Sequence, residues 1–90
     1  MQRRIQGFIW LDWVVDKIDS KHSVEPEEVE ETFFGGQTKV RKTESGKYLL
    51  YERSSDGRYL FVVVTWVGQQ VKVVTARDMT QSEQRFYARK

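Results

Sequence analysis

Apolar residues recur with two different periods along this chain, and the period changes near residue 38. Four early apolar positions follow the spacing i, i+3, i+4 and i+7 of one helix face: Leu11, Val14, Val15 and Ile18. We therefore predict an amphipathic helix that ends near residues 20–22. The alternating and aromatic residues of the segment 4–10 before it predict a short strand or an extended lead-in.

A second helix is predicted from Pro26, because proline favours the first helical position. The acidic residues around it favour the positive end of the helix dipole. Val29 and Phe33 are spaced to pack inward, and Gly35-Gly36 is expected to end the helix.

From Thr38 onward the apolar period is two, and three short turn signals divide the chain into four β-rich segments. Loops this short predict an antiparallel meander. The polar segment 38–43 suits an edge, and the segment 59–67, apolar on both faces, suits the centre. Thr80 and Glu83 have the capping-box spacing, which predicts a last helix from there.

The predicted order of elements is β-α-α-β-β-β-β-α. This is an α+β fold in which an antiparallel meander of four to five strands packs with two N-terminal helices and one C-terminal helix, the helices covering one face. Ninety residues allow one domain, 1–90, with a modest core.

Composition narrows the class of protein. The hydrophobic fraction of 39% with 31% charged residues is typical of a globular chain. The absence of cysteine excludes disulfides and thiolate catalysis and fits the cytoplasm. Asp12 and Asp16 interrupt the first apolar stretch, so neither a signal peptide nor a membrane contact is expected.

Charge is unevenly distributed although the net charge is only +2. Residues 1–31 carry four basic and eight acidic side chains, whereas residues 32–90 carry eleven basic and five acidic ones. Such a division predicts a basic face for an anion and an acidic face for something else, or merely solvated surfaces.

Two residues are the first candidates for chemistry. His22, the only histidine, lies between the two predicted helices, and an unperturbed imidazole titrates near neutral pH. Arg77 ends the last predicted strand and by alternation shares a face with Val71, Val73 and Thr75. An arginine on such a face needs a partner, which is either a carboxylate such as Asp78 or Glu83 or an external phosphate.

Further cations and one tyrosine extend the candidate set. Arg53 and Arg58 flank an Asp-Gly turn and could contact a nucleic-acid backbone, or could simply keep the surface soluble. Tyr87 follows Glu83 by one helical turn and could serve as acid or base if nearby cations lower its pKa. The carboxylates of residues 27–31 have no matching histidine pair, so we predict no metal site and no cofactor.

Three stretches of the chain resemble the BrnT (DUF497) toxin family. They are Trp10-Leu11-Asp12, the segment Lys21-His22-Ser23-Val24 that leads into an acidic helix, and Ala76-Arg77-Asp78-Met79-Thr80 followed by Glu83 and Tyr87. A central Gly57-Arg58-Tyr59-Leu60 also fits the family pattern. Where that pattern has glycine this chain has Ser23, which bears on the placement of His22 if the position needs a left-handed conformation.

The resemblance implies a RelE-like fold, cleavage of RNA without a metal ion, and inhibition by a cognate antitoxin that itself binds operator DNA. It implies His22, Arg77 and Tyr87 as catalytic residues, and we expect Lys21, Arg53, Arg58 and Arg85 to contact RNA. Two alternatives stay open at this point. One is a non-catalytic RNA- or protein-binding module of the same fold, and the other is a structural subunit whose acidic helix faces a basic partner.

Overall fold

The computed structural model describes residues 7–33, 38–54 and 57–89. Its elements follow the predicted order: β1 (Gly7–Ile9), α1 (Asp12–His22), α2 (Pro26–Phe33), β2 (Lys39–Lys42), β3 (Tyr48–Arg53), β4 (Tyr59–Val67), β5 (Gln70–Asp78) and α3 (Gln81–Ala88). The α+β prediction is confirmed. The predicted helix stop at Gly35-Gly36 and part of the segment 4–10 lie outside the described residues.

The sheet has five strands in the order β1-β5-β4-β3-β2. β2 to β5 form the predicted antiparallel meander, with β2 at an edge and β4 in the middle. β1 differs from the prediction because it pairs with β5 in parallel, so the sheet is mixed. A parallel partner is possible here because α1 and α2 provide the long crossover that such a pair requires.

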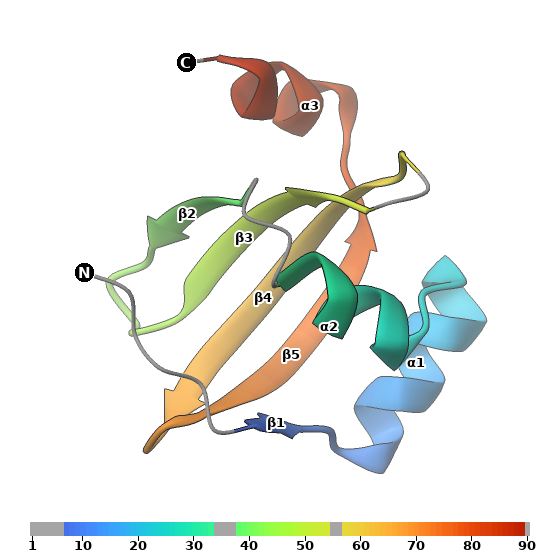
Figure 1. Ribbon diagram of the computed structural model, residues 1–90, viewed down its shortest axis with the longest axis vertical. Helices are drawn as coiled ribbons and strands as arrows, with labels where there is room; N and C mark the ends of the chain where they lie inside the picture. The colour runs from blue at the N-terminus through green and yellow to red at the C-terminus, as the bar shows by residue number, and fades with distance from the viewer. Residues whose placement is uncertain (1–6, 34–37, 55–56, 90) are drawn as a thin grey trace.

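Two layers of side chains cover opposite faces of the sheet. On one face α1 and α2 bury an aliphatic cluster that includes Val14, Ile18 and Val29 against Leu60 and Val62. On the other face α3 covers a smaller aromatic cluster, so the expectation that the helices share one face was wrong for α3. In Figure 1, α2 crosses in front of the sheet and α3 lies at its upper end.

A β-bulge explains why α3 finds an aromatic surface beneath it. Val63 pairs with Thr75 but Val64 pairs with Val73, so one extra residue of β5 shifts the alternation. Arg77 therefore does not share the face of Val71 and Val73, which belong to the aliphatic cluster. It pairs with Phe61 on the α3 face instead.

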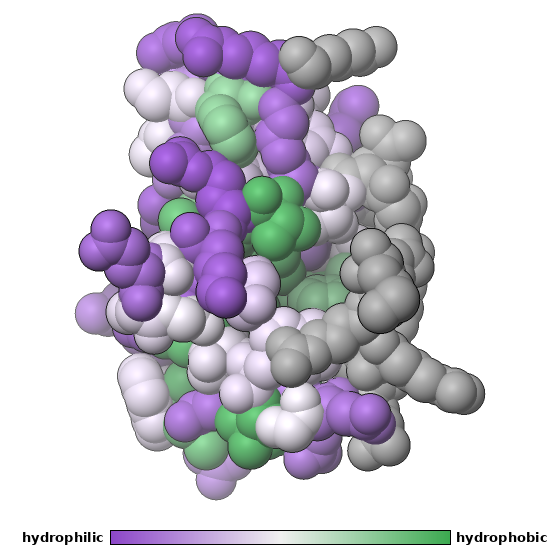
Figure 2. Space-filling view, turned by 90° about the vertical axis from the view of Figure 1, so that its left-hand side faces the viewer, coloured by the Kyte–Doolittle hydropathy of each residue, from purple (hydrophilic) through white to green (hydrophobic). Residues whose placement is uncertain are grey.

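The β2 edge is basic and mostly hydrophilic. Lys39, Arg41 and Lys42 flank the exposed Val40 on this short strand, and hydrophilic residues predominate on the side of the molecule seen in Figure 2, around small hydrophobic areas. Charged side chains on a short edge strand discourage pairing with other chains. Within the described ranges no helix is long and apolar enough to cross a membrane.

Candidate functional site

A cleft of about 530 Å³ lies between α3 and the facing ends of β3 and β4. Its volume is within the range of small-ligand sites. It is lined by Arg53, Tyr59, Gln81, Gln84, Arg85, Tyr87 and Ala88. Three of the residues predicted from sequence meet here, namely Arg53, Arg85 and Tyr87.

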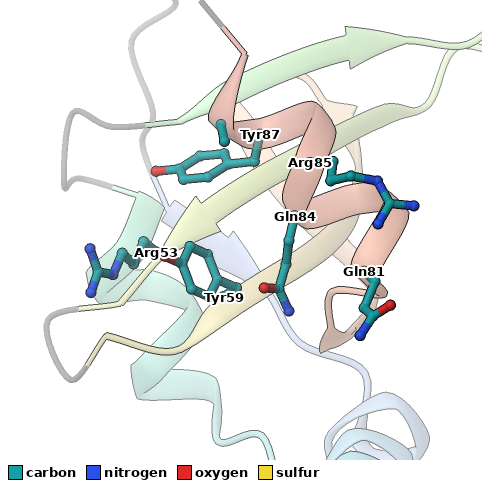
Figure 3. A pocket seen from close by; sticks show the side chains of 7 residues that line it. Arg53, Tyr59, Gln81, Gln84, Arg85 and Tyr87 are labelled. Atoms are coloured by element: carbon teal, nitrogen blue, oxygen red, sulfur yellow. The ribbon is translucent and has the colours of Figure 1, made fainter.

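Two tyrosines and one arginine of the cleft lining contact one another. The rings of Tyr59 and Tyr87 meet edge to face, with centroids 6.0 Å apart and planes inclined by 74°. The Arg53 guanidinium carbon is 5.2 Å from the centre of the Tyr59 ring, a favourable cation–π distance. Figure 3 shows Arg53 on one side of Tyr59 and Gln84 on the other, with Arg85 farther along α3.

The ionisation of Tyr87 differs from the expectation that cations lower its pKa. Burial raises the pKa of Tyr87, and this effect exceeds the opposing effect of the positive charge on Arg53. The phenol is therefore protonated at neutral pH. In this form it can donate a hydrogen bond or a proton, and it cannot act as a general base.

Arg77 forms the structural ion pair that was one of its two predicted alternatives. Its Nη1 and Nη2 atoms donate to the two carboxylate oxygens of Glu83 at 2.8 Å each, and Nη1 also donates to the Asp78 carbonyl at 3.0 Å. Its guanidinium carbon lies 4.3 Å from the centre of the Phe61 ring. The hydrogen bond from Arg77 holds the pKa of Glu83 below its ordinary value. The described residues give partners to three of the five Arg77 N–H groups.

The same carboxylate completes the predicted capping box of α3. Glu83 accepts a hydrogen bond from the Thr80 backbone N–H at 2.8 Å, and the Thr80 hydroxyl accepts one from the Glu83 N–H at 3.2 Å. Arg77 and Glu83 thus fix the start of α3 to the end of β5. The rest of that helix supplies most of the cleft residues.

Every N–H group of the Arg58 side chain donates a hydrogen bond within the fold. It donates to both carboxylate oxygens of Asp78, to a carboxylate oxygen of Glu28, and to the carbonyls of His22 and Ser23. These five bonds use all five of its donors. Arg58 therefore ties the junction of α1 and α2 to the end of β5, and it does not line the cleft.

His22 and Lys21 lie at the C-terminal end of α1, apart from the residues that line the cleft. His22 is half-buried, and its carbonyl oxygen is 2.6 Å from Arg58 Nη2. Ser23 caps this helix in the left-handed conformation, with φ 53° and ψ 39°. The position where the family pattern has glycine therefore does adopt a left-handed conformation. The helix still ends at His22, within the predicted range.

Sequence reasoning missed four residues of interest. Tyr59, Gln81 and Gln84 line the cleft, and the i, i+3 spacing of the two glutamines on the last predicted helix could have signalled a shared face. The fourth, Glu52, is only 1% exposed beneath α2. Its alternation with Leu50 was the available signal, because both share a strand face.

The Glu52 carboxyl has an unusual environment. Among the described residues, neither of its oxygens has a hydrogen-bond partner, and the same is true of the buried hydroxyl of Thr38, one residue before β2. Burial raises the pKa of Glu52 to about 7, partly offset by the nearby Thr32 hydroxyl. That hydroxyl already donates its proton to the Val29 carbonyl at 2.9 Å, so the carboxylate is poorly solvated. In the described parts of the chain no group of three or more His, Cys, Asp or Glu residues could hold a metal ion.

Comparison with known proteins identifies the family. The profile of the family described as "Ribonuclease toxin, BrnT, of type II toxin-antitoxin system" matches residues 15–83. The crystal structure of the Brucella abortus ribonuclease toxin BrnT superposes with a TM-score of 0.70 at 18% sequence identity, over 83% of this chain and 97% of that one, which shows a shared fold. No curated protein matches the sequence significantly. Because the profile spans most of the chain, this protein belongs to the BrnT family of ribonuclease toxins of type II toxin–antitoxin systems.

Proposed function

We propose that this toxin cleaves RNA at the cleft beneath α3 and that its cognate antitoxin blocks the reaction. The observation that carries the proposal is the composition of this one cleft, in which two arginines, a protonated tyrosine and a second aromatic ring line a common space. Phosphodiester cleavage requires positive charge around the phosphate and a proton donor for the leaving oxygen. The cleft supplies both.

The reaction we propose is attack of a ribose 2′-hydroxyl on its own 3′-phosphate. The new bond joins the 2′-oxygen to phosphorus, the bond from phosphorus to the 5′-oxygen breaks, and the products are a 2′,3′-cyclic phosphate and a 5′-hydroxyl end. Arg53 and Arg85 contact the phosphates, and Tyr87 gives its proton to the departing 5′-oxygen. Arg77 with Glu83 acts as a positioning pair for α3.

Two roles expected from sequence stay predictions. His22 is the expected proton acceptor for the 2′-hydroxyl, although it does not line the cleft. Arg77 is the expected stabiliser of the phosphate charge, and its N–H groups that are not used by Glu83 and Asp78 are the ones that would do so. Arg58 we assign to the fold and not to RNA, because its donors are fully used.

The test is cleavage of total RNA by the purified protein in EDTA, with the fragment ends mapped. We expect 5′-hydroxyl ends, and we expect Arg53→Gln and Arg85→Gln each to lower the rate at least tenfold by removing a phosphate contact. Lys47→Gln is the matched control, because it removes the same charge from the exposed turn at the opposite end of β3. Intact RNA with folded wild-type protein would contradict the proposal and favour the non-catalytic binding module.

We further propose that cleavage needs no metal ion, that the protein acts in the cytoplasm, and that operator DNA is contacted only through the antitoxin. Guanidinium groups can supply the charge that a metal supplies in other nucleases. Retention of full activity in EDTA tests the first statement. A gel shift of operator DNA by the toxin–antitoxin complex and not by the toxin alone tests the last.

A further inference from the structure

We infer that the cleft holds an unpaired nucleobase of the RNA, stacked on the ring of Tyr59 and read along its edge by the carboxamide of Gln84. This inference rests on the proposed function and extends it, because it makes cleavage depend on the base next to the cut. It assigns two specificity residues that lie outside the set expected from the sequence.

The ring of Tyr59 is held in a position where a flat ligand can stack on it. Its backbone is fixed at the start of β4 by pairing with Arg53 and by a hydrogen bond of 3.0 Å from the Met79 N–H to its carbonyl. Arg53 covers one side of the ring and Tyr87 meets its edge. The remaining side faces the cleft toward Gln84 (Figure 3). A ring held in this way can stack on a flat ligand at little cost in side-chain entropy.

A comparison with Tyr51 argues against a purely structural role for Tyr59. Tyr51 lies on the same face of the sheet, is 4% exposed, and packs against Phe61 and Phe86 with centroids 5.3 and 4.7 Å away. Tyr59 is half-buried and borders the cleft. Tyr51 therefore lies inside the aromatic cluster, whereas Tyr59 packs at its border and leaves part of its side chain to the cleft.

The polar side chains around the ring fit a nucleotide. A carboxamide offers a donor beside an acceptor, which is complementary to an edge that presents the same pair, as adenine does at N6 and N7. Gln84 is exposed and projects from α3 toward the Tyr59 ring. Arg53 and Arg85 lie at opposite ends of the cleft, where they can meet the phosphates on either side of the stacked base. The expected ligand is single-stranded RNA with adenine at this position.

The test measures binding of labelled tetranucleotides that carry each of the four bases at one position and 2′-O-methyl groups throughout. These probes lack the attacking hydroxyl, so binding is measured without cleavage. We expect the adenine probe to bind most tightly, and we expect Tyr59→Leu to weaken binding about tenfold, the effect of losing one stacked base. Tyr59→Phe keeps the ring and should bind like wild type.

Gln84→Ala should reduce the preference for adenine over cytosine while leaving the affinity for the cytosine probe within about twofold. Gln69→Ala, in the exposed turn before β5, is the matched control and should change nothing. Equal affinity of wild type and a folded Tyr59→Leu variant would overturn the inference, and so would an unchanged base preference in Gln84→Ala. Because the probes cannot be cut, these outcomes are independent of whether the wild-type protein cleaves RNA in EDTA.

Discussion

The two faces of the sheet are built from alternate residues of the same strands, yet they differ in chemistry. Among the described residues, the face under α1 and α2 buries a cluster of eleven aliphatic side chains, with Ile18, Leu60 and Val71 among them, and a single carboxyl, Glu52. The face under α3 buries a smaller cluster in the described part of the chain, Tyr51, Phe61 and Met79, and surrounds it with half-buried aromatic rings. Arginine and lysine side chains lie over several of these rings.

Under the proposed function, this difference separates the residues that stabilise the fold from the residues that act on RNA. An aliphatic layer that excludes water contributes most of the hydrophobic stabilisation, because the free energy follows the apolar area removed from water. A thin aromatic layer keeps phenol and guanidinium groups at the surface, where a ligand can reach them. Substitutions on the α3 face should therefore change activity more than stability, and substitutions beneath α1 and α2 should do the opposite.

The largest effect is expected from Tyr87→Phe on the α3 face. Removal of the proton donor should lower the cleavage rate at least 100-fold, in the usual range for loss of a general acid. The ring contact with Tyr59 is kept, so the free energy of unfolding should change by less than about 1 kcal/mol. Single-turnover cleavage and urea unfolding measure the two quantities. Activity near the wild-type level would reduce Tyr87 to a packing residue.

Arg58→Met tests whether a substitution on the α1 and α2 side changes stability more than activity. It removes five hydrogen bonds and leaves Asp78 and Glu28 without their cation. We expect a loss of about 3 kcal/mol in the free energy of unfolding, measured by urea denaturation. Once correction is made for the unfolded fraction, cleavage should stay within about threefold of wild type. A stable variant without activity would place Arg58 at the RNA and contradict its assignment to the fold.

Glu52 makes the α1 and α2 face sensitive to pH. The pKa of this carboxyl is raised from 4.5 to about 7 in the folded protein, so between these values the folded state binds more protons than the unfolded state. Stability must therefore fall as pH rises through this window and stay lower above it. One pH unit corresponds to about 1.4 kcal/mol, so the loss between pH 4.5 and pH 8 approaches about 3 kcal/mol.

Glu52→Gln should remove this dependence and stabilise the protein at pH 8 by about 2 kcal/mol, because the amide cannot ionise. Urea unfolding at pH 5 and pH 8 measures the effect. Glu44→Gln, in the exposed turn before β3, is the matched control and should keep the wild-type slope. Identical slopes for wild type and Glu52→Gln would mean that the carboxyl is solvated.

Local patterns predicted most of the fold. The order of elements, the capping box of Thr80 and Glu83, the edge strand 39–42 and the central strand 59–67 were all readable, because each depends on residues that are close in sequence. The carboxylate partner of Arg77 was also readable for this reason, since Glu83 follows six residues later.

The remaining features depend on how distant segments meet. The bulge between Val63 and Val64 turns Arg77 to the other face of the sheet, and no simple alternation reveals it. The partners of Arg58 come from three different elements, α1, α2 and β5. The cleft joins Tyr59 to a helix more than twenty residues later. The sequence could supply the members of the site but not their arrangement.

The smallest predicted effect concerns Ser23, at the end of α1. A residue with a Cβ atom in the left-handed region costs about 1 kcal/mol, and Ser23 adopts it because its N–H and that of Val24 close the helix on the carbonyls of Asp19 and Ile18. Ser23→Gly should raise the free energy of unfolding by about 0.5 kcal/mol, less than the full strain because glycine also gains freedom in the unfolded chain. Ser20→Gly, inside the last turn of the same helix, should lower the free energy of unfolding by a similar amount, because glycine has a lower helix propensity than serine. Opposite signs for two identical substitutions three residues apart would show that the cap itself is strained, whereas equal losses would show that Ser23 is relaxed.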